Sequence, residues 1–143
     1  MLSKKYFLVL ALMACLFASV AYAEEIIIND AYTTSFMNVN GGKFTPVTEF
    51  DAPTPVLYVI DYDLVGDPDK KYRVAIVVKS CGDKIRVTER VGPGKNIVSL
   101  TTNVVREDDV GVQTVQYVVK LKERGVKGIL DRDSETSEII IVE

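Results

Sequence analysis

The sequence predicts an all-β protein that folds as a sandwich of two sheets. Apolar and polar residues alternate with a period of two in most segments, and turn-forming residues recur about every eight to twelve residues. After residue 23, no segment has the apolar period of an ordinary helix. About seven to nine short strands are expected, and their apolar faces must be buried against each other.

The clearest element is a hairpin between residues 72 and 91. Tyr72–Lys79 is predicted to be a strand, Ser80–Asp83 a tight turn, and Lys84–Val91 the returning strand. The first strand is apolar on both faces, which suits a central position, whereas the second alternates strictly and is expected nearer an edge. The residues expected in the core are Val74, Ile76, Ile85, Val87, Val115, Tyr117 and Val119.

Further strands are expected on both sides of this hairpin. Residues 43–50 are extended, but Pro46 has no N–H to donate to a ladder, so this segment is expected at a sheet edge. The other expected strands are Glu25–Ile28, Val56–Leu64, Asn96–Val105, Gln113–Lys122 and Glu138–Val142.

The N-terminus has the three-part layout of a secretory signal peptide. Two lysines precede an unbroken apolar run, Phe7–Phe17, and Ala21-Tyr22-Ala23 is a small-x-small cleavage site. We therefore expect residues 1–23 to be removed, which leaves residues 24–143 as one domain in the periplasm or outside the cell.

Two alternatives for this segment stay open. Tyr6–Ala23 carries no charge and is just long enough to cross a bilayer as an uncleaved anchor. Leu12-Met13-Ala14-Cys15 is a loose lipobox, and its use would leave a lipidated Cys15 at the new N-terminus.

Composition excludes several chemistries. The chain has no histidine, which removes Ser-His and Cys-His catalysis and most zinc or copper sites. Cleavage after Ala23 leaves 15 basic and 20 acidic residues. This acidic excess argues against nucleic acid and against a basic face on an anionic membrane. We expect no enzyme activity and no cofactor.

Cys81 becomes the lone thiol once the signal peptide is removed. It lies in the predicted turn, with Lys79 and Lys84 as the only nearby cations, so little lowers its pKa. An inert thiol is the favoured interpretation, while an intermolecular disulfide and a redox-active thiol remain alternatives.

Acidic residues offer a weak calcium site. Asp61 and Asp63 lie around one connection, and Asp131 and Asp133 lie around another that would leave the same pole of a sandwich. Calcium takes six to eight oxygen ligands of this type. The spacings do not match a known calcium loop, so solvated carboxylates are the simpler interpretation.

Basic residues gather on exposed strand faces, where they form a stripe if their strands are neighbours. Such a stripe either keeps the sheet soluble and deters edge pairing or binds an acidic partner. Its members are Lys84, Arg86, Arg90, Lys120 and Lys122.

From about Phe50 to Val142 the chain resembles the immunoglobulin-like sandwiches of bacterial envelope proteins. The resemblance rests on Thr54-Pro55-Val56-Leu57-Tyr58-Val59, the central hairpin, Gly111–Tyr117 and the last strand, Ile139-Ile140-Ile141-Val142. It implies an immunoglobulin-like antiparallel sandwich, in which Tyr117 would act as the corner tyrosine. Paired cysteines and a core tryptophan are missing, so the resemblance implies architecture only.

These observations predict an exported, non-enzymatic binding, adhesion or assembly module of the cell envelope. A calcium-stabilised structural subunit is one alternative, and an enzyme or enzyme inhibitor that uses the acidic pole is another. Glu25–Ile28 and Glu138–Val142 are strongly apolar end strands, and two interpretations stay open. Either both strands lie inside their sheets and cover ordinary core, or one of them, with Ile140 as the position to test, offers a free edge to a protein partner or a second copy. No membrane span is expected after cleavage.

Overall fold

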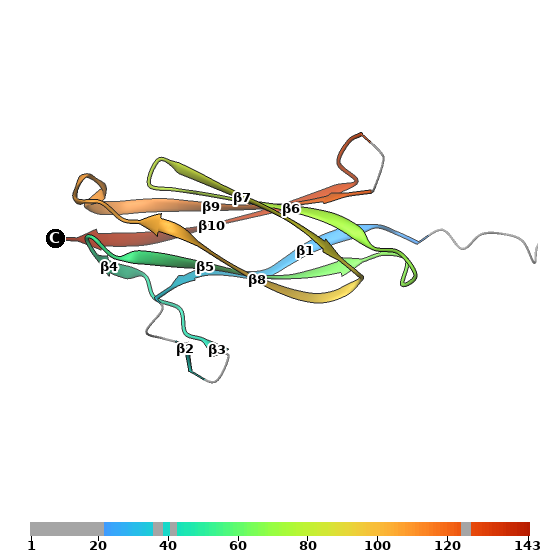
Figure 1. Ribbon diagram of the computed structural model, residues 1–143, viewed down its shortest axis with the longest axis horizontal. Coiled ribbons are helices and arrows are strands. Elements are labelled where there is room, and N and C mark those ends of the chain that lie inside the picture. Colours follow the sequence, from blue (N-terminus) through green and yellow to red (C-terminus); the bar gives the residue numbers. More distant parts are fainter. Residues whose placement is uncertain (1–21, 36–38, 41–42, 124–126) are drawn as a thin grey trace, which may run out of the picture.

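Two β-sheets pack face to face in the computed structural model, which describes residues 22–35, 39–40, 43–123 and 127–143 (Figure 1). The predicted all-β sandwich is confirmed. Within the described residues the only helical turn is a short 3-10 segment, η2 (Glu107–Asp109). Residues 1–21, and with them nearly all of the expected signal peptide, lie outside the described residues.

The smaller sheet has three antiparallel strands in the order β1 (Glu25–Thr34), β5 (Pro55–Val65) and β8 (Gly94–Val104). The central strand, β5, alternates as predicted. Its inward residues are at most 2% exposed, and they are Val56, Tyr58, Ile60, Tyr62 and Leu64.

The larger sheet has five strands in the order β4 (Glu49–Asp51), β10 (Asp131–Val142), β9 (Gly111–Lys122), β6 (Tyr72–Ser80) and β7 (Asp83–Val91). All neighbours in it are antiparallel except β4 and β10, which run parallel. β6 lies between two strands and β7 lies at the edge, as their apolar patterns predict.

The hairpin of β6 and β7 closes through a two-residue turn, as predicted. Ser80 pairs with Asp83, and Cys81 and Gly82 between them both have positive φ, at 50° and 76°. Positive φ at both central positions defines the turn type whose twist matches two paired strands. Glycine takes this conformation without strain, which explains Gly82.

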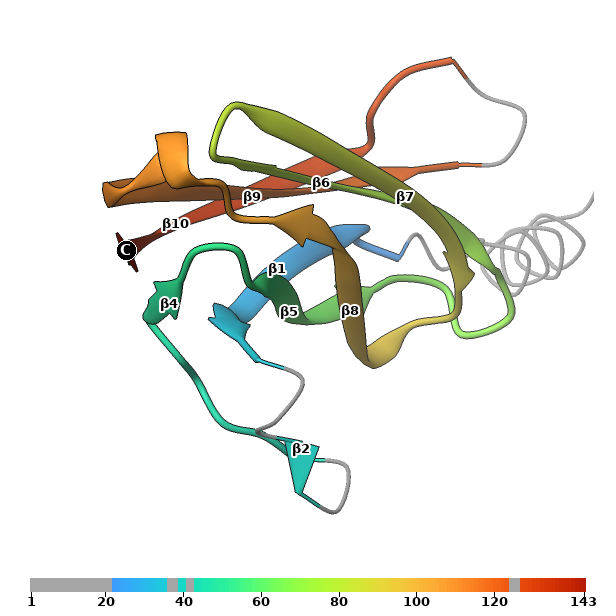
Figure 2. The same ribbon diagram turned by 60° about the vertical axis from the view of Figure 1, so that its left-hand side comes forward.

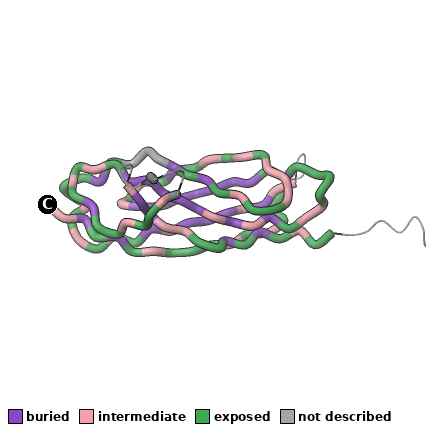
Figure 3. Tube along the Cα trace, turned by 90° about the horizontal axis from the view of Figure 1, so that it is seen from below, coloured by how far each residue is buried: buried purple, intermediate pink, exposed green. Residues whose placement is uncertain are grey.

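A single core fills the space between the sheets, and buried stretches of the chain run along the middle of the molecule (Figure 3). Of the seven residues predicted for this core, six are buried. Val87 is only partly buried, because it lies on the edge strand β7.

Tyr117 does not act as a corner tyrosine, so that prediction is wrong. Its ring is fully buried, and its hydroxyl lies 3.0 Å from Ser137 Oγ on the neighbouring strand β10. A corner tyrosine instead bonds to backbone a few residues upstream. Burial raises the pKa of Tyr117 to about 12, so this hydroxyl stays protonated and belongs to the interior of the sheet.

Two strands are longer than predicted. β1 continues through Asn29 and Asp30 to Thr34, because a register shift between Ile28 and Asp30 absorbs an extra residue as a β-bulge. β10 begins at Asp131 rather than at Glu138, and its polar first half pairs fully with β9.

Of the two interpretations of the last strand, the free edge at Ile140 is wrong and the strand inside its sheet is confirmed, because β10 lies between β4 and β9. The N–H of Ile140 donates to Thr48 O at 2.8 Å, and β4 covers this part of β10. The preceding residue, Val47, donates its N–H to Thr33 O on β1 at 2.8 Å. Adjacent residues therefore bond to different sheets, and this crossing segment closes one side of the sandwich. The position of β4 at the sheet edge agrees with the prediction from Pro46.

A short hairpin, β2 (Val39–Asn40) and β3 (Lys43–Phe44), precedes this crossing and extends away from the sandwich (Figure 2). Among the described residues there is no helix long and apolar enough to cross a membrane.

Truncation of Ile76 tests the core. Its side chain is fully buried on β6, so Ile76→Ala removes apolar contacts and leaves a cavity. We expect the free energy of unfolding, measured by urea titration, to fall by about 2–5 kcal/mol. The control is Val112→Ala, at a valine that is 65% exposed on β9, where a change within about 0.5 kcal/mol is expected. Equal losses for the two variants would contradict the assignment of faces.

Candidate functional site

The predicted basic residues lie on one surface, the outer face of the five-stranded sheet. Lys84, Arg86 and Arg90 lie on β7, and Lys120 and Lys122 lie on β9. Their strands are not neighbours, because β6 lies between them. β6 fills the gap with two further cations on the same face, and β10 adds one more. The complete set, called the basic face below, is Arg73, Lys79, Lys84, Arg86, Arg90, Lys120, Lys122 and Arg132.

Strand register sets the arrangement of the basic face. Lys79 lies opposite Lys84 in one cross-strand row, and Arg73 lies opposite both Arg90 and Lys122 in another. Between these rows Lys120 lies opposite Arg132. Neighbouring strands are about 4.8 Å apart and same-face residues along a strand about 6.7 Å apart, so these side chains are close neighbours.

Three small apolar residues occupy the centre of this arrangement. Ala75 and Val77 on β6 and Val118 on β9 face outward, yet they are only 1%, 5% and 4% exposed. Long lysine and arginine side chains cover apolar surface with their methylene groups while their charged ends stay in water. The basic face is therefore a ring of charged groups around an apolar floor.

The cations of the basic face have no negative partner within the described residues. The ion pairs there join Lys70 to Glu123 at 3.7 Å and Arg106 to Asp83 at 3.4 Å, and neither involves this face. The carboxylates on the outer side of the same sheet belong to Glu49, Asp51 and Glu138, near β4. Desolvation, followed by repulsion from Arg132, Arg86, Lys122 and Lys84, lowers the pKa of Lys120. The cations therefore act mainly on one another.

The four predicted calcium residues lie in two different settings. Asp61 and Asp63 alternate with inward residues of β5, which places them on the outer face of the three-stranded sheet. Asp131 and Asp133 lie at the start of β10 and point toward β1. Both pairs are within strands rather than in pole loops. Within the described residues, no group of three or more acidic, cysteine or histidine side chains is placed to hold a metal ion.

Asp131 and Asp133 have a structural role that the sequence did not indicate. The Ile26 N–H donates to Asp131 Oδ2 at 2.8 Å, and the Ile28 N–H donates to Asp133 Oδ2 at 2.7 Å. β1 and β10 belong to different sheets and make no ladder, so carboxylates here replace backbone acceptors along an open strand edge. We call these two bonds the carboxylate seam. The only sequence signal for it is the spacing of two between the aspartates.

Cys81 lies half-buried in the β6–β7 turn and packs against the core. Burial raises the pKa of its thiol, and the nearby carboxylates of Asp109 and Asp83 add to that rise. A raised pKa leaves little thiolate at neutral pH, which favours the inert thiol. An intermolecular disulfide stays a prediction.

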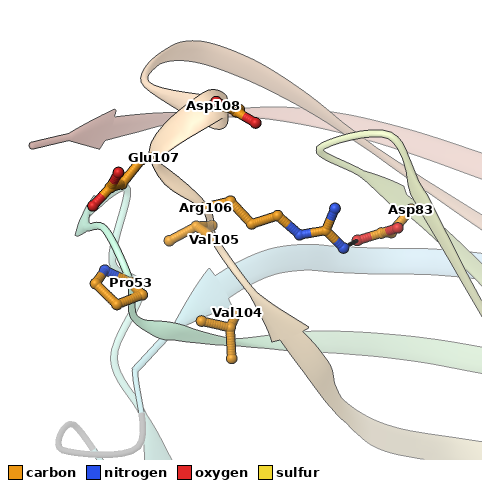
Figure 4. A pocket seen from close by; sticks show the side chains of 7 residues that line it. All are labelled: Pro53, Asp83, Val104, Val105, Arg106, Glu107 and Asp108. Atoms are coloured by element: carbon orange, nitrogen blue, oxygen red, sulfur yellow. Dashed lines mark hydrogen bonds and ion pairs between the residues drawn. The ribbon is translucent and has the colours of Figure 1, made fainter.

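A shallow groove of about 590 Å³ lies at the pole beside the β6–β7 turn (Figure 4). Its lining includes Pro53, Val104 and Glu107, and the Arg106–Asp83 ion pair runs along one wall. The side chains that line it include no serine, cysteine or histidine nucleophile. The groove therefore offers less chemistry than the basic face, and the basic face is the candidate functional site.

No model of a known protein family matches the sequence, and no curated protein matches it either.

Removal of one seam carboxylate tests the role of Asp133. Asp133→Ala leaves the N–H of the buried Ile28 without its acceptor, and we expect unfolding to become easier by about 1–3 kcal/mol. Asp133→Asn keeps an acceptor oxygen and is expected to lose less. Urea titration measures both losses, and hydrogen exchange at the Ile28 amide reports the seam directly. Asp108→Ala, at an exposed residue, is the control, and a loss no larger than this control's would contradict the seam.

Calcium binding by Asp61, Asp63, Asp131 and Asp133 stays a prediction. A calcium ion at the last two would have to compete with the β1 amides that they already bind. Melting curves with millimolar calcium and with a chelator check the prediction, because a bound ion raises the melting temperature by mass action. Identical curves would contradict it.

Proposed function

We propose that this protein is an exported, non-enzymatic binding module that engages an acidic protein surface through its basic face. One observation carries the proposal. Eight of the 17 lysines and arginines lie on one sheet face without a negative partner within the described residues, in a chain whose net charge is −3.

A purely solubilising surface is a weaker explanation for this pattern. Surfaces that only keep a protein soluble usually mix charges of both signs. Here the signs are separated, and like charges lie directly opposite one another, as Lys79 and Lys84 do, an arrangement that is unfavourable across paired strands. An unfavourable arrangement of charges is typical of a site whose function opposes stability. An acidic partner would remove the repulsion on binding.

The apolar floor adds to this interpretation. Ala75, Val77 and Val118 are covered by side chains that carry their charges at flexible ends. When those charges turn toward an acidic partner, part of the floor is uncovered and can be buried again in the contact. An interface with an apolar centre and a polar rim is the usual anatomy of protein recognition.

The strand order supports an immunoglobulin-like class for this sandwich. After β4 the chain crosses between the sheets four times, from β4 to β5, β5 to β6, β7 to β8 and β8 to β9, and the sheets have three and five strands. Such crossings are typical of the Greek-key connections of immunoglobulin-like sandwiches, which serve many binding proteins. Export to the cell envelope rests on the expected signal peptide, and the non-enzymatic role rests on the absence of histidine from the sequence.

Binding to labelled poly-L-glutamate tests the basic face. The double variant Arg86→Gln and Lys120→Gln removes two central charges, and we expect affinity to fall by about 1–2 kcal/mol, or roughly 5- to 30-fold. Fluorescence anisotropy at low and high salt measures the loss. The melting temperature should stay equal or rise, because the variant relieves repulsion among like charges.

A matched control removes the same number of charges elsewhere. The double variant Lys71→Gln and Lys127→Gln changes two exposed lysines outside the basic face. It should bind poly-L-glutamate nearly as well as the unchanged protein. Equal losses for both double variants would mean that net charge, and not the basic face, drives binding, and this would refute the proposal.

A further inference from the structure

The opposite surface of the sandwich carries the opposite charge. Asp61 and Asp63 lie on the outer face of the three-stranded sheet, and Asp30 on β1 lies directly opposite Asp61 in register. These three aspartates are called the acidic face below. Burial, followed by the carboxylates of Asp30 and Asp61, raises the pKa of Tyr32 on the same strand as Asp30. The carboxylates therefore lie close enough to act on one side chain.

One cation, Lys95, shares the outer face with these aspartates. Within the described residues no ion pair involves Asp30, Asp61 or Asp63, although Lys95 lies opposite Asp63 in register. Among the residues that the structure describes, no donor reaches one oxygen each of Asp61 and Asp63, and these two oxygens are buried. A buried carboxylate oxygen without a donor is costly, so a contact that turns these side chains toward donors would be favourable.

We propose that the acidic surface bound by the basic face is the acidic face of a second copy of this chain. The inference rests on the proposed function and adds the identity of the partner. Lysine and arginine side chains of one copy reach the aspartates of the next, so two unpaired surfaces of the same molecule satisfy each other. Charge complementarity of this kind sets orientation and suppresses wrong pairings.

The contact joins two different surfaces of the molecule, so it is head-to-tail. The basic face belongs to one layer of the sandwich and the acidic face to the other, so a copy uses both at once with different neighbours (Figures 1 and 2). A head-to-tail contact between different surfaces closes into a ring only for particular rotations, and otherwise it extends into a filament. Association beyond a dimer is therefore expected.

Asp30 is exposed, and Asp61 and Asp63 are half-buried. The last residue of β1, Thr34, pairs with Leu57, whereas Asp61 and Asp63 lie further along β5. The chain continues from Thr34 into the β2–β3 hairpin, so the hairpin departs from the other end of the sheet. Ile97 lies opposite Asp61 on β8 and is 65% exposed, which places an apolar side chain beside the carboxylates. This side chain can contact the apolar floor of the neighbouring basic face.

The size of the contact predicts weak association. The basic face extends over four strands and four same-face rows, about 14 Å by 20 Å between outer residues. A standard stable interface buries about 800 Å² on each partner, so this contact lies at the low end. It should therefore depend strongly on salt, because exposed charges are screened beyond about 10 Å at 0.1 M and about 3 Å at 1 M.

Sedimentation velocity with two complementary variants tests the proposal, using the protein as the host cell processes it. Arg86→Glu with Lys120→Glu disables the basic face, and Asp61→Asn with Asp63→Asn disables the acidic face. The unchanged protein should form dimers and larger species at low salt and return to monomer at high salt. Each variant alone should stay monomeric, and an equal mixture should form dimers but nothing larger, because each copy keeps one working face.

Controls carry the same changes off the two faces. Lys71→Glu with Lys127→Glu, and Asp69→Asn with Asp108→Asn, alter exposed residues and should associate like the unchanged protein. Circular dichroism establishes that each variant is folded, and a variant that unfolds is replaced by its single-site form.

Three results would overturn the proposal: an unchanged protein that is monomeric at every concentration at low salt, variants that each still associate alone, or a mixture that stays monomeric. If the protein is monomeric but still binds poly-L-glutamate through the basic face, the proposed function stands and its partner is another acidic protein. If both measurements are negative, both proposals fail.

Discussion

Strand alternation is the constraint on which this structure depends. Both sheets bury one face in a shared core, so every residue next to an inward apolar side chain has to face outward. Val119 and Leu121 on β9 are fully buried, and this fixes Lys120 and Lys122 on the outside. Alternation in each of four neighbouring strands sorts the cations of the larger sheet onto one surface. The basic face is therefore a consequence of the same pattern that forms the core.

The carboxylate seam is the exception to this sorting, because its two charged residues face inward. Asp131 and Asp133 occupy inward positions of β10, where an apolar residue would be usual. They are tolerated because each accepts a β1 amide at the side of the sandwich, while Val47 and Thr48 close the remainder of that side. On the described part of the chain, one oxygen each of Asp61 and Asp63 has no such donor.

The sequence was sufficient for the fold class, the β6–β7 hairpin and the alternating core, since each follows from local apolar periodicity. It was not sufficient for the first half of β10, because Asp131–Ser137 has polar residues on both faces and its strand is fixed by pairing with β9. The bulge in β1 lies at Asn29 and Asp30. Asparagine and aspartate are also common in turns, so the local sequence predicted that the strand ends at Ile28. Five cations of the basic face were identified from the sequence, but Arg73, Lys79 and Arg132 required the strand order. The sequence could not decide whether Ile140 lies on a free edge, because its acceptor is Thr48 O, 92 residues earlier in the chain.

Zero-length carboxyl–amine cross-linking in a mixture of isotopically light and heavy protein tests the central claim most directly, because only a light–heavy pair reports a contact between copies. The account predicts hybrid cross-links that join Asp61 or Asp63 of one copy to Lys84, Lys120 or Lys122 of another, and predicts that they disappear at high salt. Hybrid cross-links through other surfaces, or cross-links confined to single copies under low-salt conditions, would contradict it.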